Sequence, residues 1–315
     1  MSFQSFMFNR MCTKSDKKRD AGLTIPDDIE YIRDISYGRN KKYHILDVCY
    51  PKSAIRVSNE DIIDGDSENT PKSMKKLPII ISIHGGGYVY GTKEVYQFYC
   101  ADLAKRGFAV INFNYRLAPK YKFPAPLEDL TRVFKWIMSN VDDYQFDLDN
   151  VFLVGDSAGA QLVSQYAAIY SNREYRNIMN IKKPNKIKIK AVGLACGLYD
   201  LKSSYIEQNG KGMMKDYLGS NIDKYGEKLN ILDYINKDFP PAYIFSSKGD
   251  FLMDNCQPMA ELLKERGVKC KYKIYGNKKT GHVFHVNVRD EIGQEANRDQ
   301  TDFFKKFAKG DRPFW

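Results

Sequence analysis

A serine flanked by glycines lies between a predicted strand and a predicted helix. Residues Asn150–Val154 form an apolar, β-branched run of strand length, and Gly155-Asp-Ser-Ala-Gly159 follows directly. From Ala160 to Tyr170, apolar side chains recur at three- and four-residue spacing, as in a helix. This G-x-S-x-G pattern is typical of a sharp turn that presents a nucleophilic hydroxyl, here that of Ser157. The five residues alone also fit a glycine-rich turn with an incidental serine, so the assignment needs partners elsewhere.

A serine hydroxyl is a weak nucleophile until a base removes its proton, and histidine is the first candidate for that base. The chain has four histidines. His282 follows the last predicted core strand and is the expected base. His285 is the alternative base, or else a partly exposed residue at the start of a helix. His44 lies within a predicted hairpin strand, where we expect a structural role, and His84 opens a glycine-rich turn with a different role.

Two aspartates beyond a predicted strand are candidates for the group that orients the histidine. Asp250 ends the strand and loop that start at Ala242, and Asp254 follows where a carboxylate is typical of a helix N-terminus. In parallel sheets, sites gather beyond the carboxyl ends of strands, where Ser157, Asp250 and His282 are all predicted to lie. We therefore predict a triad of Ser157, His282 and Asp250, with Asp254 as the alternative acid.

A run of glycines supplies candidate donors for the oxyanion that forms when a serine attacks an acyl group. His84-Gly-Gly-Gly87 follows the apolar strand Leu77–Ile83, and no side chains on its glycines block the approach of a substrate to the N–H groups. The N–H of Ala158 lies next to the nucleophile at the predicted helix N-terminus and can join them. Three glycines alone are weak evidence for an oxyanion hole. Their position after a buried strand and upstream of Ser157 makes this evidence stronger.

The elements that must position these residues alternate between strands and helices. This alternation is typical of a mostly parallel central sheet with helices on both faces. Upstream, Tyr31–Tyr37 and Tyr43–Tyr50 alternate apolar and polar residues and predict an antiparallel hairpin at a sheet edge. The predicted strands are Leu77–Ile83, Phe108–Phe113, Asn150–Val154, Lys190–Cys196, Ala242–Ser246 and Cys270–Tyr275, and the other predicted helices cover about 94–106, 126–140, 255–266 and 290–308.

Three segments depart from this alternation. Residues 1–30 combine aromatic, methionine and basic residues and predict one or two short helices that lead into the core. Residues 53–76 are polar and charged and predict a long surface loop. Residues 200–237 contain no predicted strand and only mixed helical fragments around Met213–Leu218.

The charge and hydropathy of the chain exclude several classes of partner. The net charge is +10, from 49 Lys and Arg against 39 Asp and Glu, but the lysines are scattered among acidic residues. The densest basic clusters, Lys14–Arg19 and Ile181–Lys190, are typical of a solvated surface, so we do not expect a nucleic-acid partner. No apolar run approaches the roughly 18 residues of a membrane helix, so we expect no membrane insertion.

The cysteines indicate a reducing environment. They lie far apart, contain no C-x-x-C pair and mostly fall in apolar runs, which favours buried thiols over a disulfide framework or a metal site. The N-terminus lacks the basic start and the cleavage site of a signal peptide, so we expect a cytoplasmic location. The six cysteines are Cys12, Cys49, Cys100, Cys196, Cys256 and Cys270.

Six motifs, in order and at family spacing from about residue 77 to the C-terminus, resemble the hormone-sensitive-lipase-like group of α/β-hydrolase esterases. The resemblance implies an α/β-hydrolase fold, in which a mostly parallel sheet has helices on both faces and a helical cap above it. It also implies hydrolysis of carboxylic esters without a cofactor or metal. The motifs are His84–Gly87, Asn114–Pro119, Phe123–Asp129, Gly155–Gly159, Asp250–Asp254 and His282–Phe284.

The resemblance implies a role for each residue of the predicted triad. Ser157 would attack the acyl carbon, His282 would take its proton and later protonate the leaving alcohol, and Asp250 would orient His282. Two positions depart from the family pattern: Phe251 stands where proline is frequent, and Val283 stands where glycine is usual. Neither change removes a catalytic group, but Val283 could narrow the site.

The same resemblance assigns the oxyanion hole to the N–H groups of Gly86, Gly87 and Ala158. Tyr88 follows these glycines and could line the acyl or alcohol pocket. An ordinary packed tyrosine fits the sequence at this position equally well.

The resemblance also divides the chain into a core and a cap. Residues 1–30 correspond to an N-terminal cap segment and 200–237 to a cap insertion. Residues 31–199 and 238–315 then form the α/β-hydrolase core.

The leading hypothesis is a serine carboxylesterase for short-to-medium acyl esters, acetyl esters among them, with a small-molecule ester as its partner. One alternative on the same fold is an acyl-peptide or amide hydrolase, although such peptidases often carry a large extra domain. Another is a non-catalytic protein that binds a small ligand in the esterase pocket, which predicts a broken triad or oxyanion loop. An interfacial lipase is disfavoured because no long amphipathic lid is evident. The natural ester and homo-oligomer formation are left open.

Overall fold

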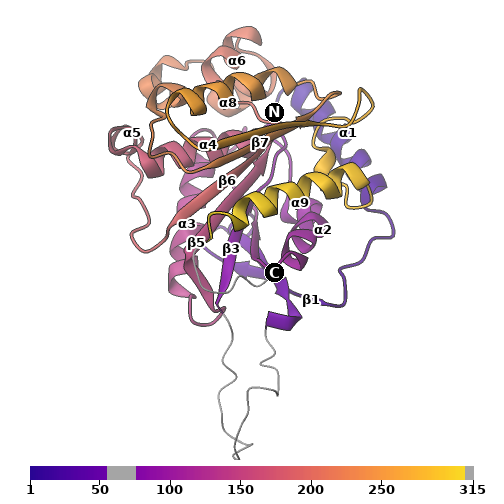
Figure 1. Ribbon diagram of the computed structural model, residues 1–315. Coiled ribbons are helices and arrows are strands. Elements are labelled where there is room, and N and C mark those ends of the chain that lie inside the picture. Colours follow the sequence, from indigo (N-terminus) through magenta and orange to yellow (C-terminus); the bar gives the residue numbers. More distant parts are fainter. Residues whose placement is uncertain (55–75, 309–315) are drawn as a thin grey trace, which may run out of the picture.

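The computed structural model describes residues 1–54 and 76–308, so the loop predicted over 53–76 falls almost wholly outside the described residues. These residues form an eight-stranded sheet with the order β1-β2-β4-β3-β5-β6-β7-β8 (Figure 1). Strands β3 to β8 run parallel, whereas β1 and β2 form an antiparallel hairpin at one edge. The predicted fold class is therefore confirmed. The strands are β1 (Ile29–Ser36), β2 (Ile45–Pro51), β3 (Leu77–Ile83), β4 (Ala109–Phe113), β5 (Phe146–Asp156), β6 (Ile189–Ala195), β7 (Ala242–Ser247) and β8 (Cys270–Tyr275).

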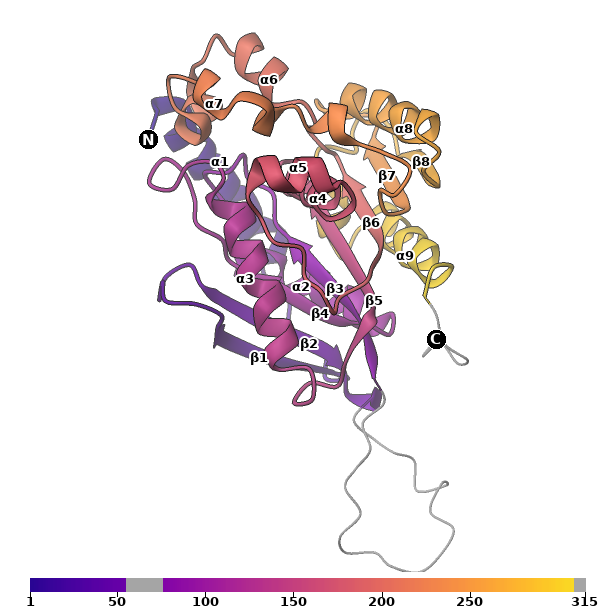
Figure 2. The same ribbon diagram turned by 90° about the vertical axis from the view of Figure 1, so that its left-hand side faces the viewer.

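Helices cover both faces of the sheet (Figure 2). Helices α2 and α9 pack on one face around Tyr99 and Phe152, and α3, α4 and α8 pack on the other around Leu130 and Leu153. The α-helices are α1 (Phe3–Asp20), α2 (Lys93–Lys105), α3 (Ala125–Ser139), α4 (Ala158–Ser171), α5 (Arg173–Met179), α6 (Leu201–Glu207), α7 (Gly212–Leu218), α8 (Cys256–Glu265) and α9 (Glu291–Lys305). Short 3-10 helices are η1 (Lys52–Ala54), η3 (Asp223–Leu229), η4 (Ile231–Tyr234), η5 (Met253–Asn255) and η6 (Phe284–Val286).

The position of β3 at the centre of the sheet follows from its sequence. All seven residues of Leu77–Ile83 are buried, because β4 and β5 flank the strand and helices cover both of its faces. A strand that is buried on both faces typically has a continuous apolar sequence. Most residues of Leu77–Ile83 are also β-branched, which favours a strand. The carboxyl ends of β3, β5, β7 and β8 therefore meet at one edge of the sheet, where a site can form.

Three local predictions need correction. Residues 1–30 contain a single 18-residue helix, α1, where one or two short helices were predicted. His44 does not lie within a strand but just before β2, in a turn where the Asn40 N–H donates to its Nδ1 over 3.2 Å. Cys12 and Cys270 are only half-buried, although all six cysteines carry free thiols, as predicted.

Asp129 is a buried charge that joins three segments of the core. Its carboxylate accepts hydrogen bonds from the backbone N–H of Arg116 at 2.8 Å and from the side chain of the same residue at 2.9 Å. Arg132 Nη1 approaches it to 2.8 Å and His44 Nε2 to 3.0 Å. Burial lowers the pKa of His44 despite this carboxylate. The structural role expected for His44 is thus a contact with Asp129, and the sequence motifs around Arg116 and Asp129 form one ion-pair cluster.

We predict that Asp129→Asn lowers the free energy of unfolding by about 3 kcal/mol, because it removes the charge of a fully buried carboxylate that Arg116, Arg132 and His44 all contact. Urea denaturation would measure the loss. Asp149→Asn is the matched control, because Asp149 and Lys188 form an ion pair in which both side chains are more than 60% exposed. This control should leave the free energy of unfolding nearly unchanged. Equal losses in the two variants would contradict the buried-pair explanation.

Candidate active site

The turn that carries Ser157 is built from close backbone contacts. Ser157 has φ 51° and ψ −119°, a conformation that costs energy for a residue with a side chain. Its N–H donates to the carbonyl of Ala195 on β6 over 2.9 Å, which fixes the turn to the sheet. A Cβ atom at Gly155 would lie 2.5 Å from the backbone of Gly159, and one at Gly159 would lie 2.1 Å from the carbonyl oxygen of Ile83. Both glycines of the motif are therefore required by close approach.

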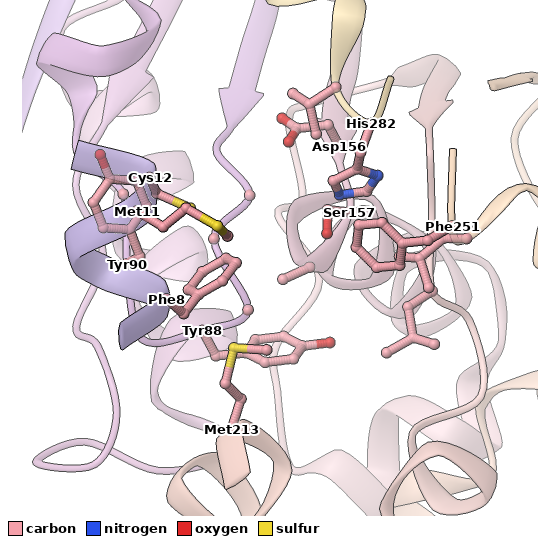
Figure 3. Close-up of a pocket in the computed structure, with 18 of the residues that line it drawn as sticks. Phe8, Met11, Cys12, Tyr88, Tyr90, Asp156, Ser157, Met213, Phe251 and His282 are labelled. Carbon is pink, nitrogen blue, oxygen red and sulfur yellow. The ribbon is translucent and has the colours of Figure 1, made fainter. Parts of the chain in front are cut away.

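The predicted base and acid lie beside this serine. His282 Nδ1 and Asp250 Oδ1 are 2.6 Å apart, and Figure 3 shows the Ser157 hydroxyl beside the His282 ring. Ser246 Oγ donates to Asp250 Oδ2 over 2.5 Å, and the N–H of Leu252 donates to Oδ1 over 2.9 Å. Burial alone would raise the pKa of Asp250, but His282 and these donors outweigh burial and lower the pKa to about 2. The carboxylate therefore stays ionised and can orient the imidazole.

The alternative base and acid occupy other environments. His285 is 1% exposed, and its ring makes edge contacts with Tyr99 and Phe245, each at a centroid distance of 5.2 Å. Burial lowers its pKa to about 3. The expectation of a partly exposed residue is thus wrong, because the 3-10 turn η6 directs His285 into the apolar core. Asp254 is exposed in η5, and it is Asp250 that contacts His282.

The glycine-rich turn after β3 has free donors. Among the described residues, the N–H groups of Gly86, Gly87 and Ala158 donate to no other group. His84 does not act as a base here, because its Nδ1–H donates to the carbonyl of Gly85 over 2.8 Å and burial lowers its pKa to about 4. Tyr115 holds the glycine-rich turn in place. Its hydroxyl donates to the His84 carbonyl over 2.9 Å, and its ring stacks on the His84 ring at a centroid distance of 4.1 Å.

A buried carboxylic acid and a tyrosine connect the turn at Ser157 to the glycine-rich turn after β3 (the predicted oxyanion turn), and the sequence did not reveal this connection. Tyr96 Oη accepts the N–H of Gly85 over 3.0 Å and donates to Asp156 Oδ2 over 2.8 Å. Burial raises the pKa of Asp156 to about 7, although the hydrogen bond from Tyr96 and the nearby His282 act to lower it. The position of Asp156 next to Ser157 could have marked it as a residue of the site, but nothing in the sequence indicates its contact with Tyr96.

A cavity of about 710 Å³ opens in front of Ser157. One wall comes from α1, the opposite wall from the turns that carry Phe251 and His282, and the rest from the oxyanion turn and the α6–α7 region (Figure 3). Apolar and polar groups share the lining. Lining residues outside the core motifs include Phe8, Met11, Cys12, Ser15, Asp16 and Arg19 of α1, Ser204 and Glu207 of α6, and Met213 and Met214 of α7.

Tyr88 both lines this cavity and packs as a structural tyrosine. Its ring stacks on Tyr217 of α7 at a centroid distance of 3.8 Å, and its hydroxyl donates to Gln161 Oε1 over 3.1 Å. The Gln161 amide in turn donates to Gln165 over 2.8 Å, and Gln165 donates to the carbonyl of Lys228 in η3 over 3.0 Å. This buried chain of polar groups connects the oxyanion turn, α4 and the segment before β7.

Polar contacts fix α1 along the cavity. The Ser2 N–H and Ser5 Oγ donate to Asp216 Oδ2 of α7 over 2.8 and 2.7 Å. Further along, the Tyr90 hydroxyl donates to Asp16 over 2.7 Å, and the guanidinium of Arg19 donates to the carbonyl of Val95 over 2.7 Å. The first helix of the chain is thus bound to α7 at one end and to the segment after the oxyanion turn at the other.

The described residues contain one group of three side chains with metal-ligand chemistry: Cys196, Asp250 and His282, whose ligand atoms lie within 4.8 Å of one another. Burial, reinforced by Asp250, raises the pKa of Cys196 well above its usual range, so its thiol keeps its proton and is a poor ligand. Asp250 and His282 already bond to each other. The donor set therefore favours a hydrogen-bonded pair over a metal centre.

A comparison with family models decides the class of the protein. Residues 68–265, well over half of the chain, match the family described as BD-FAE. The chain belongs to the BD-FAE family. Two curated relatives agree with this assignment. A versiconal hemiacetal acetate esterase from Dothistroma septosporum is 28% identical over 247 residues, which cover 69% of this chain and 72% of that protein. An acetyl esterase from Salmonella schwarzengrund is 26% identical over 250 residues, with 74% of each chain covered.

Solved structures of esterases share the fold. Esterase B from Lactobacillus rhamnosis superposes with a TM-score of 0.82 at 23% identity, and 96% of this chain and 94% of that chain are covered. An esterase from Pyrobaculum calidifontis gives a TM-score of 0.70 at 24% identity, with 97% and 91% covered. These structures confirm the α/β-hydrolase fold. Together with the family match and the esterase relatives, they confirm the resemblance to hormone-sensitive-lipase-like esterases, and the protein is a carboxylic ester hydrolase. No helix in the described part of the chain has the length and apolarity to cross a membrane.

The raised pKa of Asp156 predicts a pH-dependent stability. The folded protein keeps this proton up to about pH 7, whereas an unfolded aspartate loses it near 3.8, so the stabilisation is complete below pH 3.8 and lost as the pH rises toward 7. Across that window, wild type should therefore lose free energy of unfolding relative to Asp156→Asn, as measured by urea denaturation at a series of pH values. Tyr96→Phe removes a donor that lowers this pKa, so the loss should extend to higher pH. Parallel profiles for wild type and Asp156→Asn would refute this account.

Proposed function

We propose that the protein is a serine carboxylesterase that hydrolyses short-to-medium acyl esters, acetyl esters among them, with Ser157, His282 and Asp250 as its triad. The observation that supports this most is the strained turn at Ser157, which presents a hydroxyl beside the hydrogen-bonded pair of His282 and Asp250 in a cavity. Free N–H groups of Gly86 and Gly87 border the same cavity.

In the proposed mechanism, His282 Nε2 removes the proton of Ser157 as Oγ attacks the acyl carbon. The carbonyl oxygen becomes an oxyanion, which the N–H groups of Gly86, Gly87 and Ala158 stabilise. When the tetrahedral intermediate collapses, the bond to the alcohol oxygen breaks and His282 protonates the leaving alcohol. Water then attacks the acyl-enzyme, with His282 again as base, and the carboxylic acid leaves Ser157 in its original state.

The size and walls of the cavity support a small-molecule ester as substrate. A volume of about 710 Å³ is within the range that small-molecule sites occupy. The relatives named above are an acetate esterase and an acetyl esterase, and on this chain a short acyl group is the corresponding proposal. Val283 lines the cavity, where the family motif usually has glycine, and Phe251 packs on the His282 ring at 4.4 Å. Both side chains narrow the catalytic end of the cavity.

We also propose that residues 1–30 and 200–237 act as a cap on a core made of 31–199 and 238–315. Helices α1, α6 and α7 line the cavity, and the bonds from Ser2 and Ser5 to Asp216 hold α1 to α7. The cap would then select the alcohol and acyl parts, while the core performs the chemistry.

We also propose that the protein is located in the cytoplasm. Its support is that all six cysteines are unpaired and four of them are buried, which suits a compartment that keeps thiols reduced.

We predict that wild type cleaves p-nitrophenyl acetate and butyrate with higher kcat/KM than the octanoate or longer esters, because Phe251 and Val283 narrow the catalytic end of the cavity. Ser157→Ala should reduce kcat by roughly 10⁴-fold or more, since no other group can form the acyl-enzyme. Steady-state release of p-nitrophenol measures both effects. Turnover by wild type no faster than by Ser157→Ala would overturn the serine mechanism.

The assignment of the acid has its own test. Asp250→Asn should lower kcat by roughly 10⁴-fold, because an amide favours the wrong imidazole tautomer. Asp254→Asn is the matched control, because this exposed aspartate lies four residues away, and it should keep near wild-type kcat. Similar losses in the two variants would show that Asp250 is not the orienting group.

A further inference from the structure

The solvent-facing side of α1 divides into an apolar half and a basic half. Five of the seven large hydrophobic residues that are exposed in the described part of the chain lie in this helix or at its start. Met1 precedes the helix, and the other four lie within α1, where the steps from Phe3 to Phe6 and Met7 and from Met7 to Met11 place them along one side. They are Met1 (59% exposed), Phe3 (79%), Phe6 (48%), Met7 (48%) and Met11 (65%).

Basic residues continue this side toward the C-terminal half of the helix. Arg10, Lys14, Lys17 and Lys18 are all exposed. The acidic residues of the helix do not offset them, because Arg19 pairs with Asp16 at 3.0 Å and with Asp20 at 2.7 Å, and all three side chains are less than 20% exposed. The exposed side of α1 therefore carries apolar groups toward its N-terminus and positively charged groups toward its C-terminus, and both kinds of group favour contact with an anionic lipid surface.

The opposite side of α1 is already occupied. Ser2 and Ser5 bond to Asp216 of α7, and Phe8 packs at 6.2 Å, ring to ring, against Tyr90. The exposed Phe and Met side chains consequently have no place in the core while α1 keeps these contacts. A large apolar surface of this kind usually marks an interaction site.

The exposed apolar residues reach the mouth of the cavity. Met11 lines the cavity from α1 although it is 65% exposed, and Phe251 lines it from the other side although it is 75% exposed (Figure 3). An apolar phase that covered α1 would therefore adjoin the opening that leads to Ser157.

We propose that the exposed side of α1 docks the protein on an anionic lipid surface, with Phe3, Phe6 and Met7 at the level of the headgroups and Lys14, Lys17 and Lys18 against the lipid phosphates. The protein lies on this surface and does not span it. In this position the cavity receives esters that are dissolved in the lipid. This substrate class rests on the ester hydrolysis proposed above, whereas the docking itself does not.

Charge selects this occupant over a second copy of the chain. Two α1 helices that met through this side would bring their exposed cations together, which opposes association. An anionic lipid surface attracts the same cations, and each Lys or Arg near such a surface strengthens binding.

Sedimentation with vesicles tests the docking. Full-length Ser157→Ala, which cannot hydrolyse esters, is mixed with vesicles of phosphatidylcholine alone or with a phosphatidylserine fraction. We expect binding to the anionic vesicles that weakens with salt. Lys14→Glu/Lys18→Glu and, separately, Phe3→Ser/Phe6→Ser should each weaken partitioning by about tenfold or more. The matched control is Lys182→Glu/Lys186→Glu, which makes the same change in net charge at exposed lysines elsewhere.

Three results would overturn the docking proposal: no binding to anionic vesicles, equal losses in both lysine variants, or a dimer in solution that Phe3→Ser/Phe6→Ser dissociates. Catalysis is measured separately, in proteins that retain Ser157. Lys14→Glu/Lys18→Glu should keep wild-type turnover of dissolved p-nitrophenyl acetate but lose turnover of a vesicle-embedded ester. Equal turnover of the embedded ester would refute delivery from lipid, whereas no turnover of either ester by wild type would refute the esterase mechanism and leave the vesicle binding intact.

Discussion

The contact between the start of α4 and the end of β3 is the constraint on which the active site depends. Gly159 approaches the carbonyl of Ile83 so closely that no side chain fits between them. This approach places the helix N-terminus, and with it the N–H of Ala158, next to the turn that carries Gly86 and Gly87. The same approach forces the chain through Ser157 at a positive φ. Ser157 and the N–H groups of Gly86, Gly87 and Ala158 are therefore held by a single backbone arrangement, and neither part can shift without the other.

The site controls charge by placing each carboxyl group in a different environment. Asp250 receives hydrogen bonds from Ser246, Leu252 and His282, so it remains ionised although it is buried. Asp156, in contrast, is fully buried, and burial outweighs the hydrogen bond from Tyr96 and the nearby His282, so its pKa rises to about 7. Two acids close to the same histidine thus differ in protonation over the acidic pH range. This difference leaves the orientation of the imidazole to Asp250.

Much of the fold and of the site could be predicted from sequence because the signals were local. The turn at Ser157 needs a strand, two glycines and a helix within a few residues, and the buried strand Leu77–Ile83 reads as one apolar run. Contacts between distant segments could not be predicted in this way. Tyr96 meets Asp156 across 60 positions, and His285 is buried in the core against Tyr99 and Phe245, which are distant from it in the sequence. The same holds for α1, whose position depends on Asp216.

The bond between Ser2 and Asp216 closes a loop of 214 positions. Closing so long a loop costs chain entropy, and the contacts that α1 makes in return are few and mostly polar. Elements with these properties tend to open before the rest of a domain. Helix α1 is therefore expected to separate from α7 before the sheet unfolds, and the cavity is complete only while these two helices are in contact. A chain that lost only this contact would keep Ser157, His282 and Asp250 together but would leave the cavity without its α1 wall.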